Sequence, residues 1–166
     1  AETRFFPQHT LVRFQASLIG LAEARLRSLL PGNGQSIELA RQRGLAAVRD
    51  AIEELRQLQL ELEQKAAAAS PRSNNNNKDD FPVFSREQLQ ALSRDVEYQI
   101  LAALAIRSRF YKASESASRD DTWLQILELG GRLQPRLSNE SALWWETQAQ
   151  MLEAYRGFQE WNAWQV

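Results

Sequence analysis

Residues 36–69 form one long run of strong helix formers, and this run most constrains what the chain can fold into. It is rich in Leu, Glu, Gln, Arg and Ala. Its apolar residues recur at steps of three and four, with Gln59 filling one place in the series: Leu45, Val48, Ile52, Leu55 and Leu62. A narrow apolar seam of this kind packs against another helix, as in a coiled coil. The run therefore predicts an all-α protein in which this helix has a helical neighbour.

The segment before this run supplies a candidate neighbour. Residues 11–30 carry apolar side chains near helical spacing, and PGNG at 31–34 ends that segment with proline and glycine. A connection this short favours an antiparallel hairpin. We therefore assign residues 1–69 to an N-terminal helical hairpin.

The composition changes abruptly after the hairpin. SPRSNNNNKDD, residues 70–80, has no apolar side chain and cannot bury enough surface to offset the entropy of ordering it. We expect a flexible Asn-rich loop over residues 70–84. The FPVF segment at its end is expected to dock on the helical body through Phe81, Val83 and Phe84.

A third helix is predicted from Ser85 to about Tyr111. Ser85 and Gln88 have the spacing of a capping box. The expected buried stripe runs along one side of this helix: Leu89, Leu92, Val96, Ile100, Ala103, Ile106 and Phe110. Tyr98, with Leu101 and Ala105, makes the other side partly apolar too, which indicates a second neighbour. A helix covered on two sides fits a stacked array.

Two more helices are expected after a polar connection at residues 113–121. Asp120 or Asp121 would cap the fourth helix, residues 122–133, in which Gly130 and Gly131 either end the helix or admit a close neighbour. Pro135 would stop it.

Ser138 or Asn139 would cap the fifth helix. In it Trp144, Gln148, Met151, Tyr155 and Phe158 recur at steps of four and three. Aromatic stripes at helical spacing are usually core. We therefore expect Trp144, Trp145, Met151 and Tyr155 to form one buried seam.

The C-terminal block WWETQAQMLEAYRGFQEWNAW resembles the first helix and turn of a tetratricopeptide (TPR) unit. In that resemblance Trp145, Ala149, Leu152 and Tyr155 belong to helix A, a turn follows at residues 157–159, and Trp161 opens helix B. It makes residues 85–166 a TPR-like region, although no clean 34-residue period links one unit to another. The implied fold is a right-handed α-solenoid fragment of antiparallel helix pairs. The alternative is a helical bundle of about five helices. Either would form one continuous helical domain, which we expect to be part of a longer protein.

The resemblance implies a non-catalytic scaffold for protein–protein interaction. Its partner would be a protein or peptide, or further repeats of the same chain. The residues expected on the partner-binding or stacking surface are Trp161, Trp164, Tyr98, Arg107 and Arg109. Trp161 and Trp164 stand out, because we expect them to begin a helix that the given sequence does not complete.

The sequence gives little support for a catalytic or metal-binding function. The chain has no cysteine, and its single histidine, His9, has no companion at catalytic or metal-binding spacing. Paired carboxylates such as Glu53 and Glu54 are better explained as a solvated helix face. We therefore predict no enzyme, no catalytic or metal-binding residue, no cofactor and no small-molecule substrate. No apolar run approaches the ~20 residues that span a bilayer. The compartment is not readable from this chain.

A regulatory or nucleic-acid-associated helical module is the alternative function. It would use the basic surface near residues 107–119, where Arg107, Arg109, Lys112 and Arg119 lie beside Phe110 and Tyr111. The whole chain has 20 basic and 21 acidic residues and a net charge of −1. A nucleic-acid ligand needs an electrostatic footprint that this balance does not supply. Arginines that cover the rim of a packed helix are therefore the preferred interpretation.

Overall fold

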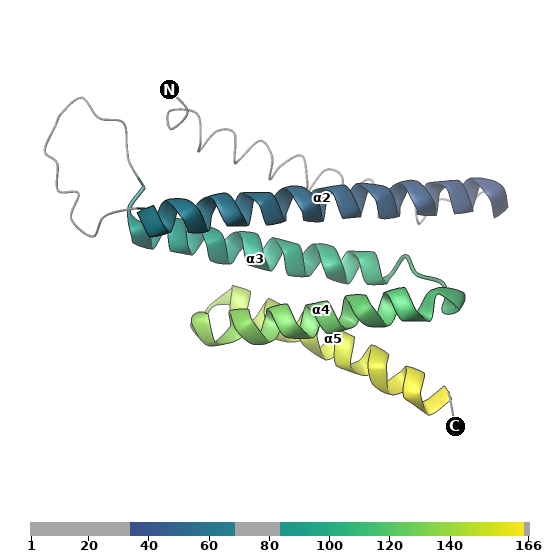
Figure 1. The fold of residues 1–166 in the computed structure, drawn as a ribbon. Coiled ribbons are helices and arrows are strands. Elements are labelled where there is room, and N and C mark those ends of the chain that lie inside the picture. The colour runs from purple at the N-terminus through teal and green to yellow at the C-terminus, as the bar shows by residue number, and fades with distance from the viewer. Residues whose placement is uncertain (1–33, 69–83, 165–166) are drawn as a thin grey trace, which may run out of the picture.

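The computed structural model describes residues 34–68 and 84–164, and within these ranges it contains helices and turns but no strand. Four α-helices lie there: α2 (Gly34–Ala68), α3 (Arg86–Ser108), α4 (Ser116–Leu133) and α5 (Ala142–Trp164) (Figure 1). Two short 3-10 helices, η1 (Ala113–Glu115) and η2 (Gln134–Arg136), join α3 to α4 and α4 to α5. The all-α prediction is confirmed. The expected helix at 11–30, His9 and the loop at 70–80 lie outside the described residues.

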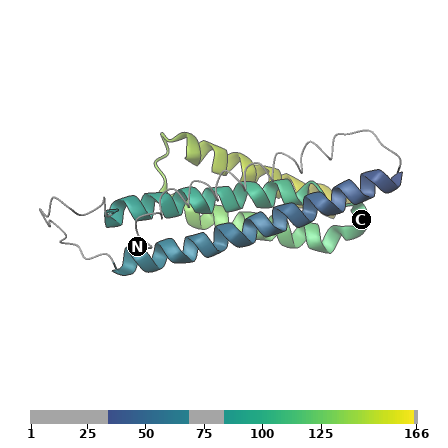
Figure 2. The same cartoon turned by 90° about the horizontal axis from the view of Figure 1, so that it is seen from above.

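The helices run up and down in chain order, each beside the next (Figure 1). α3 is the central element, because it packs against α2, α4 and α5 (Figures 1 and 2). Its side chains Val96 and Leu101 are both completely buried. The prediction that α3 has neighbours on two sides is therefore confirmed.

The α2 seam forms largely as its spacing predicts. Val48 and Leu62 are fully buried, and Ile52 and Leu55 nearly so. Leu58, 2% exposed, occupies the place in the core that the pattern gave to Gln59. Gln59 lies at the edge of the seam and donates a 3.0 Å hydrogen bond to Glu97 on α3. Within the described residues the seam packs on α3, and a pairing with residues 11–30 remains a prediction.

The start of α3 is the clearest local success of the sequence pattern. The Gln88 backbone N–H donates to Ser85 Oγ at 3.2 Å, and the Ser85 N–H donates to Gln88 Oε1 at 2.8 Å. This reciprocal capping box satisfies two donors that the first turn would otherwise leave without partners. Phe84 packs partly buried against the core, as expected, while Phe81 and Val83 lie outside the described residues.

The predicted start of α4 is wrong. The helix begins at Ser116, so Asp120 and Asp121 lie inside it rather than at its cap. The Glu115 carboxylate accepts the Lys112 backbone N–H at 3.0 Å, and η1 leads directly into α4. Glu115 therefore satisfies one backbone donor at the turn that leads into η1 and α4.

The start of α5 and the turn expected within it also need correction. Ser141, not Ser138 or Asn139, is the cap, since its Oγ accepts the Trp144 N–H at 3.2 Å. The turn predicted at residues 157–159 is absent, because α5 continues to Trp164. Gly157 instead lies where the indole of Trp123 presses against the backbone of α5.

The buried face of α5 differs from the predicted one. Trp145 is 63% exposed and Tyr155 is 51% exposed, so both were wrongly placed in the buried seam. Thr147 and Ala154 are the fully buried side chains here, and Met151 is half-buried. Small side chains let α5 approach α3 and α4 closely, and the Thr147 hydroxyl donates to the Leu143 carbonyl at 2.8 Å. This hydrogen bond allows a polar residue to occupy the core.

Candidate functional site

An exposed apolar row follows the outer side of α5. We call Trp145, Ala149, Leu152 and Tyr155 the α5 outer row; all four are exposed, and Leu152 is 65% exposed. Trp145 is held by an edge-to-face contact with Trp144, whose ring centroid lies 4.7 Å away. A large aromatic side chain can bury roughly 150–250 Å², so Trp145 and Tyr155 leave on the order of 200 Å² uncovered. An apolar row of this size on a surface helix marks a candidate binding surface.

These four residues are the ones that the TPR resemblance placed in helix A. The structure brings them together on one side of α5, but facing outward. The sequence pattern therefore predicted the row correctly, but the prediction that the core covers this side of the helix was wrong.

Two of the other predicted site residues fix α5 to α3. Arg109, just after α3, makes a two-pronged ion pair with Glu153 of α5, with Nη2 2.8 Å and 3.0 Å from the two carboxylate oxygens. Tyr98 lies beside Glu146 of α5, and burial together with a hydrogen bond to that carboxylate raises the pKa of Tyr98. Tyr98 and Arg109 therefore position α5 and border its outer row.

Trp161 and Trp164 belong to the last turns of α5 by their backbone. Their side chains lie outside the part of the chain that the structure describes. Their place on a partner surface remains a prediction.

A charged network ties the start of α2 to the connection between α3 and α4. Arg41 donates to Glu38 at 2.7 Å and to Glu115 at 2.8 Å, and Lys112 pairs with Glu38. The Arg41 guanidinium and then the Lys112 ammonium lower the pKa of Glu38 to about 2. The pKa of Glu115 is also lowered, first by the Lys112 backbone N–H and then by Arg41. Arg41 and Glu115 are 74 positions apart, so no local sequence pattern could have revealed this network.

Arg107 lines a hollow that Arg41 and Glu115 of this network also line. Its Nε donates to the Tyr111 hydroxyl at 2.8 Å, and its guanidinium lies 5.9 Å from the centre of the Tyr111 ring. The hollow, which we call the Arg107 pocket, has a volume of about 460 Å³. Its lining comes from α2, the end of α3, the connection after it and η1: Arg41, Gln42, Leu45, Ala46, Arg49, Arg107, Tyr111 and Glu115.

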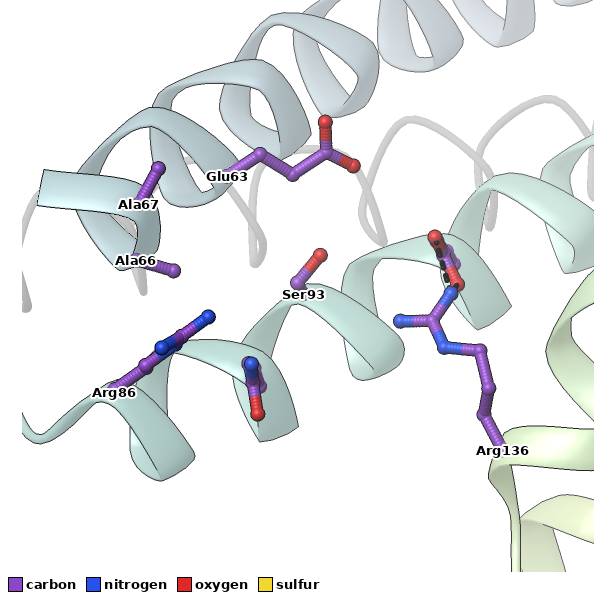
Figure 3. Close-up of a pocket in the computed structure, with 8 residues that line it drawn as sticks. Glu63, Ala66, Ala67, Arg86, Ser93 and Arg136 are labelled. Atoms are coloured by element: carbon purple, nitrogen blue, oxygen red, sulfur yellow. Dashed lines mark hydrogen bonds and ion pairs between the residues drawn. The ribbon is translucent and has the colours of Figure 1, made fainter. Parts of the chain in front are cut away.

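A second pocket, of about 270 Å³, lies between the end of α2 and the start of α3 (Figure 3). Its main feature is the nearly buried carboxylate of Glu97, which accepts hydrogen bonds from Arg136 Nη1 at 2.7 Å and 2.9 Å. Arg86 and Glu63 add one charge of each sign, so the lining has no net charge. We interpret it as a structural pairing that neutralises Glu97 where η2 meets α3.

Metal-binding and membrane-crossing features are absent from residues 34–68 and 84–164. Within them, no group of three or more His, Cys, Asp or Glu side chains could hold a metal ion. None of the helices in these ranges combines the length and the hydropathy that a membrane crossing requires.

Residues 34–68 and 84–164 form an all-helical bundle, and α5 carries an outward-facing apolar row. No family model, no curated protein and no solved structure matches it. The residues of the chain itself are therefore the basis for a functional proposal.

Proposed function

We propose that the chain is a non-catalytic protein–protein interaction scaffold of the TPR-like helical-repeat type. The α5 outer row would receive an apolar helix face, supplied by a protein or peptide partner or by further repeats of the same chain. The observation that carries the proposal is the exposure of Trp145, Leu152 and Tyr155, each more than half exposed, on one side of one helix. Aromatic residues of this kind dominate binding energy at protein interfaces.

The size of the row sets the strength that such an interface can have. Covering about 200 Å² of aromatic surface is worth on the order of 5 kcal/mol at ~25 cal/mol per Å². Association itself costs a comparable amount, and a stable interface buries roughly 800 Å² on each partner. The row would therefore serve as the anchor of a larger contact that also covers its polar borders.

The charged residues support a protein partner over a nucleic acid. Arg109 and Lys112, central to the basic surface predicted near 107–119, are paired with Glu153 and Glu38. A phosphate backbone would have to displace these carboxylates. The net charge of −1 also provides no long-range attraction for it.

The test is site-specific photo-crosslinking in cells that express the chain naturally. A photoreactive residue at Ala149, in the middle of the row, is compared with one at Leu60, an isolated exposed leucine of α2 that is 58% exposed. The proposal expects discrete protein adducts from position 149 and few from position 60. Adding Trp145→Ser and Leu152→Ser should remove those adducts.

The comparison separates a specific surface from general stickiness. Adducts of equal number and pattern from both positions would contradict the proposal. So would adducts from position 149 that survive loss of both apolar side chains.

A further inference from the structure

The Arg107 pocket is independent of the α5 outer row. It is built by α2, the end of α3, the connection that follows α3, and η1, with no residue of α5 in its lining. At about 460 Å³ it falls within the size range of small-molecule sites.

The charge of the pocket favours an anion. Three arginines and one carboxylate line it. Arg41 is already held by Glu38 and Glu115, which leaves Arg49 and Arg107 as the source of the excess positive charge. Arg49 lies on α2 and Arg107 on α3, the two helices that face each other across the hollow.

Arg107 is the oriented member of the pair. Its Nε is used by the Tyr111 hydroxyl, and no acceptor among the described residues contacts its two terminal nitrogens. Those nitrogens present a planar fork that matches two oxygens of a phosphate group. Because the Tyr111 oxygen accepts from Arg107, its own hydroxyl hydrogen can be donated to an anion.

Arg49 is available from the opposite wall. Its ion pair is with its neighbour Asp50, and the two side chains are 74% and 66% exposed. An exposed pair of this kind is worth little, so Arg49 can exchange Asp50 for a bound anion at small cost.

The apolar part of the lining indicates which kind of organic group the ligand carries. Leu45 and Ala46, both half-buried, lie on the α2 side of the pocket. A bare phosphate ion would leave this surface uncovered. A phosphate carried on a small apolar or aromatic group would contact both parts of the pocket.

We propose that the Arg107 pocket binds a small phosphate monoester, with Arg49 and Arg107 holding the phosphate, Tyr111 donating a hydrogen bond and Leu45 contacting the organic group. A phosphate monoester carries about −1.5 to −2 charges near neutral pH, which suits two arginines. The site takes a small molecule and does not depend on the interaction surface of α5.

The test is an NMR titration of backbone amides with phenyl phosphate, using inorganic phosphate and phenol as the two partial ligands. Phenyl phosphate should shift amides at residues 45–49 and 107–111, and bind more tightly than either partial ligand. Arg49→Met and Arg107→Met should each weaken binding about tenfold or more, because each removes a charged hydrogen-bond donor. Arg107→Lys, which keeps the charge and loses the fork, should fall between Arg107→Met and the unchanged chain.

Matched controls make the outcome decisive. Arg43→Met removes an exposed arginine of α2 outside the pocket, and Trp145→Ser alters only the α5 outer row; both should bind phenyl phosphate normally. The proposal is wrong if Arg49→Met and Arg107→Met titrate like Arg43→Met, or if phenol binds as tightly as phenyl phosphate. Equal affinity for inorganic phosphate would refute the monoester assignment.

Discussion

Three glycines of the two C-terminal helices should respond in different ways to the same substitution. Gly130, Gly131 and Gly157 all lie in helical backbone, and none of them has a positive φ. Alanine at each site therefore gains about 1 kcal/mol of helix propensity. What differs is the space available to the new methyl group.

At Gly131 the methyl group would meet nothing within 4 Å, so Gly131→Ala should stabilise the fold by about 0.5–1 kcal/mol. At Gly157 it would lie 2.6 Å from Trp123 Cε2 and 2.7 Å from Cη2. The indole has little room to move, because its ring centroid lies 5.5 Å from that of Phe158 and the Arg119 guanidinium lies 4.8 Å from its centre.

Overpacking of this kind costs about 1–3 kcal/mol, and disturbing the aromatic pair adds about 0.5–1.5 kcal/mol. After the propensity gain, Gly157→Ala should destabilise the fold by about 1–3 kcal/mol. Gly130→Ala should also destabilise the fold, but by less than Gly157→Ala. Its methyl group would overlap Met151 Cγ at 2.6 Å and Sδ at 2.7 Å, and the unbranched Met151 side chain yields more readily than an indole ring.

Urea unfolding followed by far-UV circular dichroism measures the series, with equal m-values as the check that only stability has changed. The expected order is Gly131→Ala, then Gly130→Ala, then Gly157→Ala. If Gly157→Ala were as stable as Gly131→Ala, the packing of Trp123 on α5 would be refuted.

Other predictions concern charge and exposure. Arg136→Met should destabilise the fold by about 1–3 kcal/mol, because it leaves the nearly buried Glu97 carboxylate without its cation. Chemical denaturation of Arg136→Met, Glu97→Gln and the double variant measures the coupling energy between the two side chains. Glu38 has its pKa lowered from 4.5 to about 2, so the stability it contributes is present above pH 4.5 and is lost as the pH falls toward 2. Glu38→Gln should therefore flatten the fall of the unfolding midpoint across that range, and an unchanged slope would contradict the network. Trp145→Ser should change thermal stability by no more than about 0.5 kcal/mol, whereas a large loss would show that the residue is buried.

Local signals in this sequence were more informative than long-range ones. Ser85 and Gln88 are three residues apart, and their capping box followed from that spacing alone. Arg41 and Glu115 meet only because α3 returns the chain beside α2. No spacing rule connects residues 74 positions apart.

The core face of α5 was misread for a different physical reason. The apolar pattern of this helix covers most of its circumference, so hydrophobicity could not decide which side faces α3 and α4. Side-chain size sets which side is buried. Thr147 and Ala154 are small enough to permit close approach of the helices, and the larger Trp145 and Tyr155 remain outside. Threonine at a buried position is hard to anticipate, because the hydrogen bond to Leu143 that makes it acceptable lies within its own helix.

The central place of α3 has a consequence for how the molecule folds and how it can be divided. Here α3 touches three other helices, and its buried residues Val96 and Leu101 belong to one shared core. Loss of α5 would uncover part of α3 as well as α4. The described helices should therefore melt in a single cooperative transition, and a boundary for dissecting the chain should not fall between α3 and α5.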